Sequence, residues 1–316
     1  MTAANNELPA PFKERLAEIL PPERFEDCWQ SFAQRKRTAF RVNGLLADSS
    51  FVAAELKRRQ LDLRPITWLA GGYSIPFEQR EVLTNGDLVA SRQIYIQNPS
   101  SAFAVKVLDP QPGEMILDLA AAPGGKTILI AEWMKNEGQI SAVESVRNRF
   151  FRLKDNLDQH GVKIAKCYLA DGRSIGRKTP ERFDRVLLDA PCSGESRIHA
   201  TDPKSWRFWS EKKIKEAARK QKGLIRSALA CLKPGGRLVY CTCSFAPEEN
   251  EAIVGRLLRE FECRIEIESI DPPIENIQAG LSHFRKHEYQ TEVSNAVRVL
   301  PDNLYDGFFV CRFRKN

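Results

Sequence analysis

Two cysteines follow apolar runs in the second half of the chain, and they are the residues most capable of chemistry. Cys192 comes shortly after Asp189 in "LLDAPCSGES", and Cys243 lies in "VYCTCSF". A thiol becomes a useful nucleophile when its pKa is lowered or when a base lies beside it. If both apolar runs are strands of one sheet, the two thiols can face a single cleft. We expect Cys241 to point away from that cleft.

Two other interpretations of these cysteines stay open. A free cysteine is most often a small buried apolar residue. A zinc site is the second alternative, with His283 and His287 as further ligands, but C-x-C plus one distant cysteine lacks the usual paired spacing, so we expect no metal. Eight cysteines in 316 residues are too few for a disulfide scaffold.

A turn of small residues, "AAAPGGKT", follows the first apolar run of the second half. Beyond the carboxyl ends of strands in an open α/β sheet, such a turn lets the backbone approach a ligand. The turn consists of Ala120, Ala121, Ala122, Pro123, Gly124, Gly125 and Lys126. A phosphate-binding P-loop needs a glycine where Ala120 stands, so the P-loop interpretation is the weaker one.

Two acids follow the next two apolar runs. Glu144 closes "ISAVE" and Asp171 opens "DGR". An acid after the second strand can hold ribose hydroxyls, and a side chain after the third can meet a base. Either acid alone is more often a loop residue or a helix cap, but together they favour a nucleoside cofactor. The G-x-G-x-x-G pattern of pyrophosphate cofactors is absent, so S-adenosylmethionine fits better.

The second half of the chain alternates short apolar runs with amphipathic segments, which predicts an α/β fold with a mostly parallel sheet. The expected strands are 115–119, 139–143, 163–168, 185–188, 237–241, 264–269 and 307–312. A helix over 211–232 carries the longest basic stripe on its outer face, and "KPGG" ends it.

The first hundred residues predict a smaller α+β unit. We expect a helix over 12–32, a strand in "TAFRVN", and a helix that begins at an N-cap at Asp48 or Ser49. "PSS" at 99–101 marks the junction. The predicted domains are therefore 1–100 and 101–316.

The net charge of +7 and the pI near 9.0 favour a polyanionic partner. Basic clusters lie at 35–37, at 57–59 and along 211–232, although a single cluster is more often a solvated face. No run approaches the roughly 18 apolar residues of a membrane span, and the first twenty residues lack the pattern of a signal peptide. We expect a cytoplasmic protein without a membrane contact, and nothing in the sequence indicates an obligate protein partner.

Several motifs, taken together, resemble the RNA cytosine-5 methyltransferases of the bacterial RsmB/NOP/Sun family. They are "RVN", "YIQNPSS", "LDLAAAPGGKT", "DAPCSGES", "YCTCSF" followed by "PEENE", and "DGFFVCRF". They occur in order from about residue 35 to the C-terminus. The pairing of the proline-cysteine motif with the threonine-cysteine-serine motif is the specific part.

The resemblance implies a Rossmann-like class I methyltransferase domain, with a seven-stranded sheet, after an N-terminal RNA-recognition-like domain. It implies that residues 120–126, Glu144, Asp171, Arg149 and Asp189 bind S-adenosylmethionine. It also implies that Cys243 is the nucleophile and that Cys192 serves product release. Lys126 and Asp189 would hold the target cytosine.

The implied reaction is methylation of C5 of a cytosine in RNA through a covalent bond between Cys243 and C6. Resemblance favours ribosomal RNA over tRNA as the partner. We expect the basic helix and the N-terminal basic clusters to hold the RNA backbone. The alternatives are a tRNA cytosine-5 methyltransferase and a non-catalytic RNA-binding ribosome assembly factor.

Overall fold

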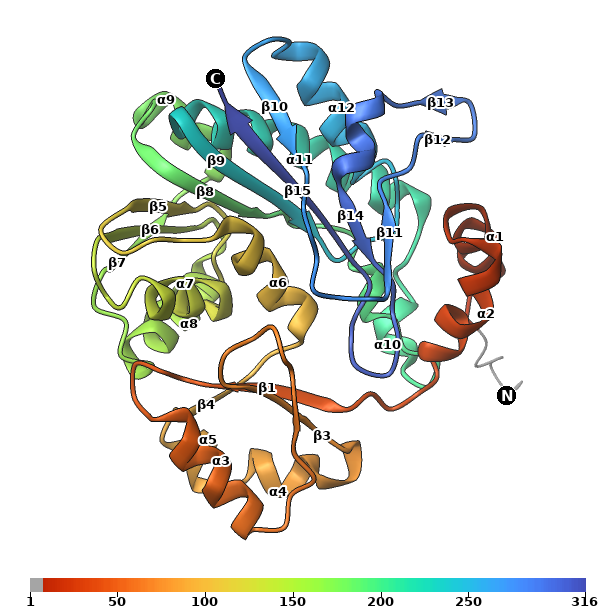
Figure 1. Ribbon diagram of the computed structural model, residues 1–316. Helices are drawn as coiled ribbons and strands as arrows, with labels where there is room; N and C mark the ends of the chain where they lie inside the picture. Colours follow the sequence, from red (N-terminus) through yellow and green to blue (C-terminus); the bar gives the residue numbers. More distant parts are fainter. Residues whose placement is uncertain (1–7) are drawn as a thin grey trace.

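The computed structural model describes residues 8–316. Residues 1–7, which begin both the predicted N-terminal domain and the segment compared with a signal peptide, lie outside the described residues. Five parallel strands form one side of a large sheet, in the order β7-β6-β5-β8-β9 with β7 at the edge (Figure 1). They are β5 (Met115–Asp118), β6 (Gln139–Glu144), β7 (Ala165–Leu169), β8 (Phe183–Asp189) and β9 (Leu232–Thr242). Because these strands are parallel, their carboxyl ends share one edge of the sheet.

Antiparallel strands extend the sheet beyond β9. They are β10 (Ile265–Glu268), β11 (Ile277–Ala279), β14 (Val297–Val299) and β15 (Phe308–Lys315). The α/β fold class is confirmed, but within residues 8–316 the sheet has nine strands where we predicted seven. The two additional strands, β11 and β14, have three residues each, which is too short for a recognisable apolar alternation.

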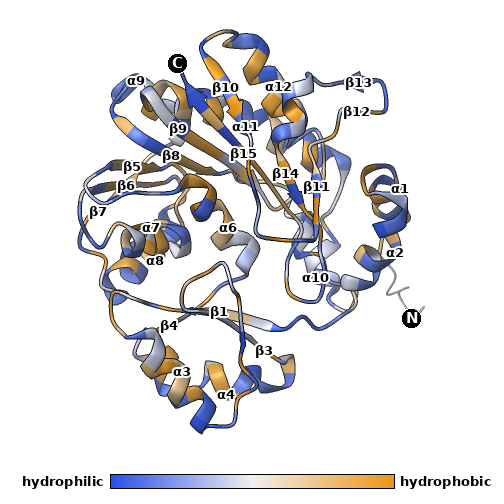
Figure 2. Cartoon of the chain, viewed as in Figure 1, coloured by the Kyte–Doolittle hydropathy of each residue, from blue (hydrophilic) through white to orange (hydrophobic). Residues whose placement is uncertain are grey.

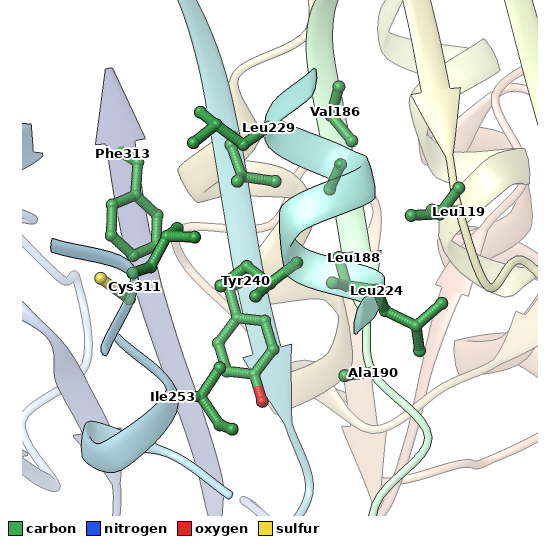
Figure 3. Packing of buried hydrophobic residues seen from close by; sticks show 14 of the residues in the cluster. Leu119, Val186, Leu188, Ala190, Leu224, Leu229, Tyr240, Ile253, Cys311 and Phe313 are labelled. Carbon is green, nitrogen blue, oxygen red and sulfur yellow. The ribbon is translucent and has the colours of Figure 1, made fainter. Parts of the chain in front are cut away.

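Helices cover both faces of the large sheet, because successive strand residues point to opposite sides. One face packs against α6 (Pro99–Leu108) and α7 (Gly125–Trp133), with α8 (Arg147–Gln159) beside them. The other packs against α9 (Ile175–Lys178), α11 (Glu211–Cys231) and α12 (Glu251–Glu260). In Figure 3, Leu224 and Leu229 of α11 pack over Val186 and Leu188 of β8. Apolar residues follow the central strands, whereas polar residues gather on the outer loops (Figure 2).

The smaller unit is a four-stranded antiparallel sheet with its own apolar core. Its strands are β1 (Thr38–Val42), β2 (Arg64–Pro65), β3 (Gly72–Ile75) and β4 (Ile94–Ile96), and its helices are α3 (Ser49–Arg58), α4 (Arg80–Thr84) and α5 (Asp87–Ala90). The predicted N-cap is confirmed, because the Asp48 carboxylate accepts the backbone N–H of Phe51 at 2.9 Å.

The predicted helix over 12–32 is wrong, because the chain forms α1 (Ala10–Ile19) and α2 (Pro22–Ser31) instead. Pro21 and Pro22 cause the break, since proline removes a helix hydrogen bond. Both helices share an apolar cluster with Phe245, Phe284 and Leu300 from the far end of the chain. The domain boundary at residue 100 stays a prediction. Although α1 and α2 belong to the predicted N-terminal domain, they pack on residues of the predicted C-terminal domain.

Candidate active site

A cavity of about 700 Å³ opens at the carboxyl edge of the parallel strands. It brings together predicted residues from four segments of the chain: Ala120, Ala121, Ala122, Pro123, Gly125, Lys126, Arg149, Asp189, Cys192 and Cys243. Residues 95–98 of the smaller unit line its other side. A second cavity of about 630 Å³, between α2 and residues 301–305, contains none of the predicted site residues. The first cavity is therefore the candidate active site.

The two thiols meet in this cavity. Cys192 follows β8 and Cys243 follows β9, and because these strands pair in parallel, the sulfur atoms lie 3.2 Å apart. The hydrogen bond with Cys192 is the largest cause that lowers the pKa of Cys243; burial opposes it, and Arg197 adds to it. The same hydrogen bond and burial raise the pKa of Cys192 well above its ordinary value. The pair therefore favours a thiolate on Cys243 and a thiol on Cys192.

Two buried carboxylates hold the cysteine loops together. Glu195, in the turn η3 (Glu195–Arg197), accepts Ser244 Oγ at 3.0 Å and the backbone N–H of Phe245 at 2.9 Å. Glu249 accepts the backbone N–H of Ser193 at 2.9 Å and Ser244 Oγ at 2.9 Å. Both carboxylates thus accept hydrogen bonds from the loop that carries Cys243. Glu195 belongs to the loop that carries Cys192, and Glu249 accepts a hydrogen bond from that loop.

Lys126 and Asp189 form an ion pair beside the thiols. Lys126 Nζ lies 2.6 Å from Asp189 Oδ2 and 2.7 Å from Ser101 Oγ. Burial is the largest single influence on the pKa of Lys126, and it lowers this pKa. Asp189, together with Cys241 and Asp118, raises the pKa by more than burial lowers it, so the net shift is upward. Lys126 is therefore a permanent cation in the cavity wall.

The expectation that Cys241 points away from the cleft is wrong. Residues two apart in a strand share a face, so Cys241 is directed to the same side as Cys243. Its sulfur lies 3.8 Å from Asp189 Oδ1 and is fully buried. Burial raises the pKa of the Cys241 thiol well above its ordinary value, so this group stays protonated.

The small-residue turn is shaped by close packing. Gly124 has φ of +108°, a left-handed conformation that favours glycine. At Gly125 a Cβ atom would lie 2.8 Å from the Tyr95 hydroxyl, which leaves no room for a side chain. Arg149 donates to the carbonyl of Ala122 at 2.6 Å and so ties α8 to the turn.

Asp118, which we did not predict, is an acid of the same cavity. Its Oδ2 accepts Thr127 Oγ1 at 2.7 Å, whereas Oδ1 is buried and has no partner within residues 8–316. Burial raises the pKa of Asp118 to about 6. The available signal was an acid at the end of the apolar strand "MILD", just before the turn. Ser101 and Arg197 also line the cavity and were not predicted.

Glu144 and Asp171 lie at the ends of neighbouring strands, as expected, but neither lines this cavity. The buried Glu144 carboxylate accepts the backbone N–H of Val146 at 2.8 Å and pairs with Arg149 at 3.6 Å. The Asp171 carboxylate pairs with Arg173 at 2.6 Å and caps the turn η2 (Gly172–Ser174). Their roles in binding a cofactor stay predictions.

Within residues 8–316 no group of three or more His, Cys, Asp or Glu side chains could hold a metal ion. His283 and His287 lie exposed on the hairpin of β12 (His283–Phe284) and β13 (His287–Glu288). In the same part of the chain, no helix combines the length and the apolar character that crossing a membrane requires.

The parallel sheet with a ligand-sized cavity at its carboxyl edge defines a Rossmann-like α/β fold of the kind that methyltransferases share. A family model described as 16S rRNA methyltransferase RsmB/F matches residues 105–314. Ribosomal RNA small subunit methyltransferase F of Vibrio parahaemolyticus is 36% identical over 315 residues, which cover 98% of this chain and 63% of that protein. The chain belongs to the RsmB/F methyltransferase family, as its motifs indicated.

Two further similarities cover nearly the whole of both chains. The tRNA (cytosine(49)-C(5))-methyltransferase of Pyrococcus abyssi is 36% identical over 309 residues, which cover 96% of this chain and 94% of that protein. The crystal structure of a methyltransferase homologue from Pyrococcus horikoshii has a TM-score of 0.82 at 32% identity and covers 96% of this chain and 94% of its own. By contrast, the chain spans 63% of the length of the Vibrio parahaemolyticus relative.

Proposed function

We propose that the protein transfers a methyl group from S-adenosylmethionine to C5 of a cytosine in RNA, through a covalent bond between Cys243 and C6. One observation carries this proposal: two thiols 3.2 Å apart lie in the same cavity as the Lys126–Asp189 ion pair and the small-residue turn. A cysteine pair with opposite pKa shifts suits a reaction that must both form and break a carbon–sulfur bond.

The cavity fits the proposed methyl donor. Its volume of about 700 Å³ is within the range of small-molecule sites. The unpartnered Asp118 Oδ1 could accept from the α-ammonium group of a methionine moiety. The turn 120–126 lets the backbone approach the same moiety. Glu144 and Asp171 lie outside this cavity, at the ends of the next two strands, and would contact the ribose and the adenine where the nucleoside extends beyond it. Bound S-adenosylmethionine would supply an electrophilic methyl group on a sulfonium.

Cys243 begins the reaction, because C5 of cytosine is too weak a nucleophile to take a methyl group directly. The thiolate forms a bond to C6, and the C5=C6 electron pair moves into the ring, which makes C5 nucleophilic and places negative charge on N3 and O2. Lys126 and Asp189 face the ring, where the Lys126 cation stabilises this charge. After methyl transfer the adduct is neutral and C5 carries both the methyl group and a proton.

Cys192 then releases the product. Its pKa is raised chiefly by Cys243, and this cause disappears once the Cys243 sulfur is bonded to carbon. Cys192 can therefore lose its own proton to solvent and accept the C5 proton. The C5–H electron pair restores the C5=C6 bond, and Cys243 leaves C6 as a thiolate.

The basic clusters support an RNA partner, but they differ in how many of their cations are already paired with carboxylates of the protein. In the cluster 57–59, Arg58 and Arg59 pair with Glu55, and Arg59 also pairs with Asp87. The stripe on α11 differs, because its cations form no ion pair within residues 8–316; they are Lys212, Lys213, Lys215, Arg219, Lys220 and Lys222. Burial and the neighbouring cations lower the pKa of Lys222. The α11 stripe is therefore the better candidate for contact with phosphates.

We favour ribosomal RNA over tRNA, although relatives of both kinds match.

The test is methyl transfer from labelled S-adenosylmethionine to unmodified ribosomal RNA, isolated ribosomal subunits and unmodified tRNA. We expect 5-methylcytidine from wild type, none from Cys243→Ala, and an accumulated protein–RNA adduct with Cys192→Ala on a denaturing gel. Cys263→Ala is the matched control, because this exposed thiol lies outside the cavity. Normal turnover by Cys243→Ala would refute the assigned nucleophile. Tight RNA binding without transfer to any of the three substrates would indicate a non-catalytic assembly factor.

A further inference from the structure

Arg197 is a cavity residue to which neither the motifs nor the proposed reaction gives a role. It ends the turn η3 and lines the cavity together with Cys192 and Cys243. The turn is fixed to the nucleophile's own backbone, because the N–H of Ser196 donates to the carbonyl of Cys243 at 3.1 Å. The buried Glu195 carboxylate holds the same turn against residues 244–246. The backbone of Arg197 is therefore held in a fixed position relative to Cys243.

Of the acids near Arg197, both carboxylates already have cations, whereas the two cysteines do not. Its guanidinium is attracted by Cys243 first, and then by Cys192, Asp189 and Asp306. Asp189 is paired with Lys126 at 2.6 Å, and Asp306 is paired with Lys36 at 2.9 Å. Arg197 itself makes no ion pair or side-chain hydrogen bond within the described residues. Of the two cysteines without a cation, only Cys243 has a lowered pKa, and within residues 8–316 Arg197 is a cavity cation without an ion-pair partner.

The other charged groups around Cys243 do not replace Arg197. Lys126 from α7 favours the thiolate, but Asp189 from β8 opposes it, and their close pairing makes the two effects largely cancel. Cys192 and Cys241 carry raised pKa values and stay neutral. The net positive charge that reaches the sulfur therefore comes from Arg197.

We propose that Arg197 holds Cys243 in the thiolate form before RNA binds, and so determines which of the two adjacent cysteines is the nucleophile. In this resting state the pair shares one proton, which stays on Cys192, and the guanidinium lies in the same cavity as the negative sulfur of Cys243. The inference rests on the proposed role of Cys243. An exposed guanidinium is partly screened by water, so Arg197 lowers the pKa of Cys243 without removing the opposing effect of burial.

The test follows alkylation of Cys243 by iodoacetamide against pH, on the full chain without RNA or S-adenosylmethionine, with peptide mass spectrometry to assign the modified thiol. Because the thiolate is the reactive form, Arg197→Gln should slow alkylation of Cys243 about three- to tenfold at pH 7 and move its pH midpoint upward. Arg197→Lys should restore most of the rate, because it keeps the charge. The matched control is Arg207→Gln, a nearby arginine outside the cavity, which should leave the profile unchanged.

Two readouts separate this inference from other effects. The alkylation rate of the buried Cys28 reports whether each variant keeps its fold, because only unfolding would expose this thiol. An unchanged pH midpoint for Cys243 in folded Arg197→Gln would overturn the inference, as would equal losses in the Gln and Lys variants. A shifted midpoint in a protein that methylates no RNA would support the role of Arg197 and reject the proposed function.

Discussion

Glu195 is predicted to be the most important single side chain for keeping the two cysteine loops together. Its carboxylate is 2% exposed and has no cation as partner within residues 8–316. It accepts four hydrogen bonds, from Trp209 Nε1 at 2.8 Å, from Ser244 Oγ at 3.0 Å, and from the backbone N–H groups of Phe245 and Ala246 at 2.9 Å each. Glu195→Ala leaves Trp209 Nε1 and the buried N–H of Phe245 without an acceptor, whereas Ser244 Oγ can still donate to Glu249 and the N–H of Ala246 to Ser244 Oγ.

The magnitude follows from the number of bonds. A hydrogen bond to a charged group contributes about 1.5–3 kcal/mol, and water entering the cavity left by Glu195→Ala recovers part of the loss. We therefore expect the free energy of unfolding to fall by about 3–5 kcal/mol. With a urea slope of about 3 kcal/mol/M, the unfolding midpoint would fall by about 1–1.7 M.

Glu195→Gln should lose about 1–3 kcal/mol, because the amide keeps one acceptor oxygen but turns its NH₂ group toward a donor. The matched control is Glu216→Ala on the exposed side of α11, which should change stability by no more than about 0.5 kcal/mol. The measurement is urea unfolding followed by circular dichroism. A Glu195→Ala variant as stable as Glu216→Ala would refute the reasoning.

Two further predictions concern the small-residue turn and its strand. The pKa of Asp118, raised to about 6, lies above its value in the unfolded chain. Between pH 4 and 6 the folded state therefore binds more protons than the unfolded state, so the free energy of unfolding should fall as pH rises through this window, by up to about 3 kcal/mol. Asp118→Asn should remove this dependence on pH, measured by urea unfolding at pH 4, 5, 6 and 7. Gly125→Ala should cost about 1–3 kcal/mol, because its Cβ would overlap the Tyr95 ring; a thermal midpoint equal to wild type would contradict this packing.

Local patterns were sufficient for the fold class and for most of the candidate residues. The alternation of apolar runs and amphipathic segments identified the five parallel strands, and the residues after β5, β8 and β9 are those that line the cavity. The sequence could not locate β11 and β14, whose three residues carry no period. The break at Pro21 was not predicted either, because the apolar residues of 12–32 follow the period of one long helix.

What the sequence determined by itself is the set of chemical groups and their order at the strand ends, because periodicity and turn chemistry are local properties. Tertiary structure alone decided how those groups interact. Cys192 and Cys243 are 51 residues apart, and only the parallel pairing of β8 and β9 brings their sulfur atoms to 3.2 Å. Burial and charge pairing also depend on distant neighbours, so only the fold shows that Arg59 pairs with Asp87 and that Arg197 lines the same cavity as Cys243.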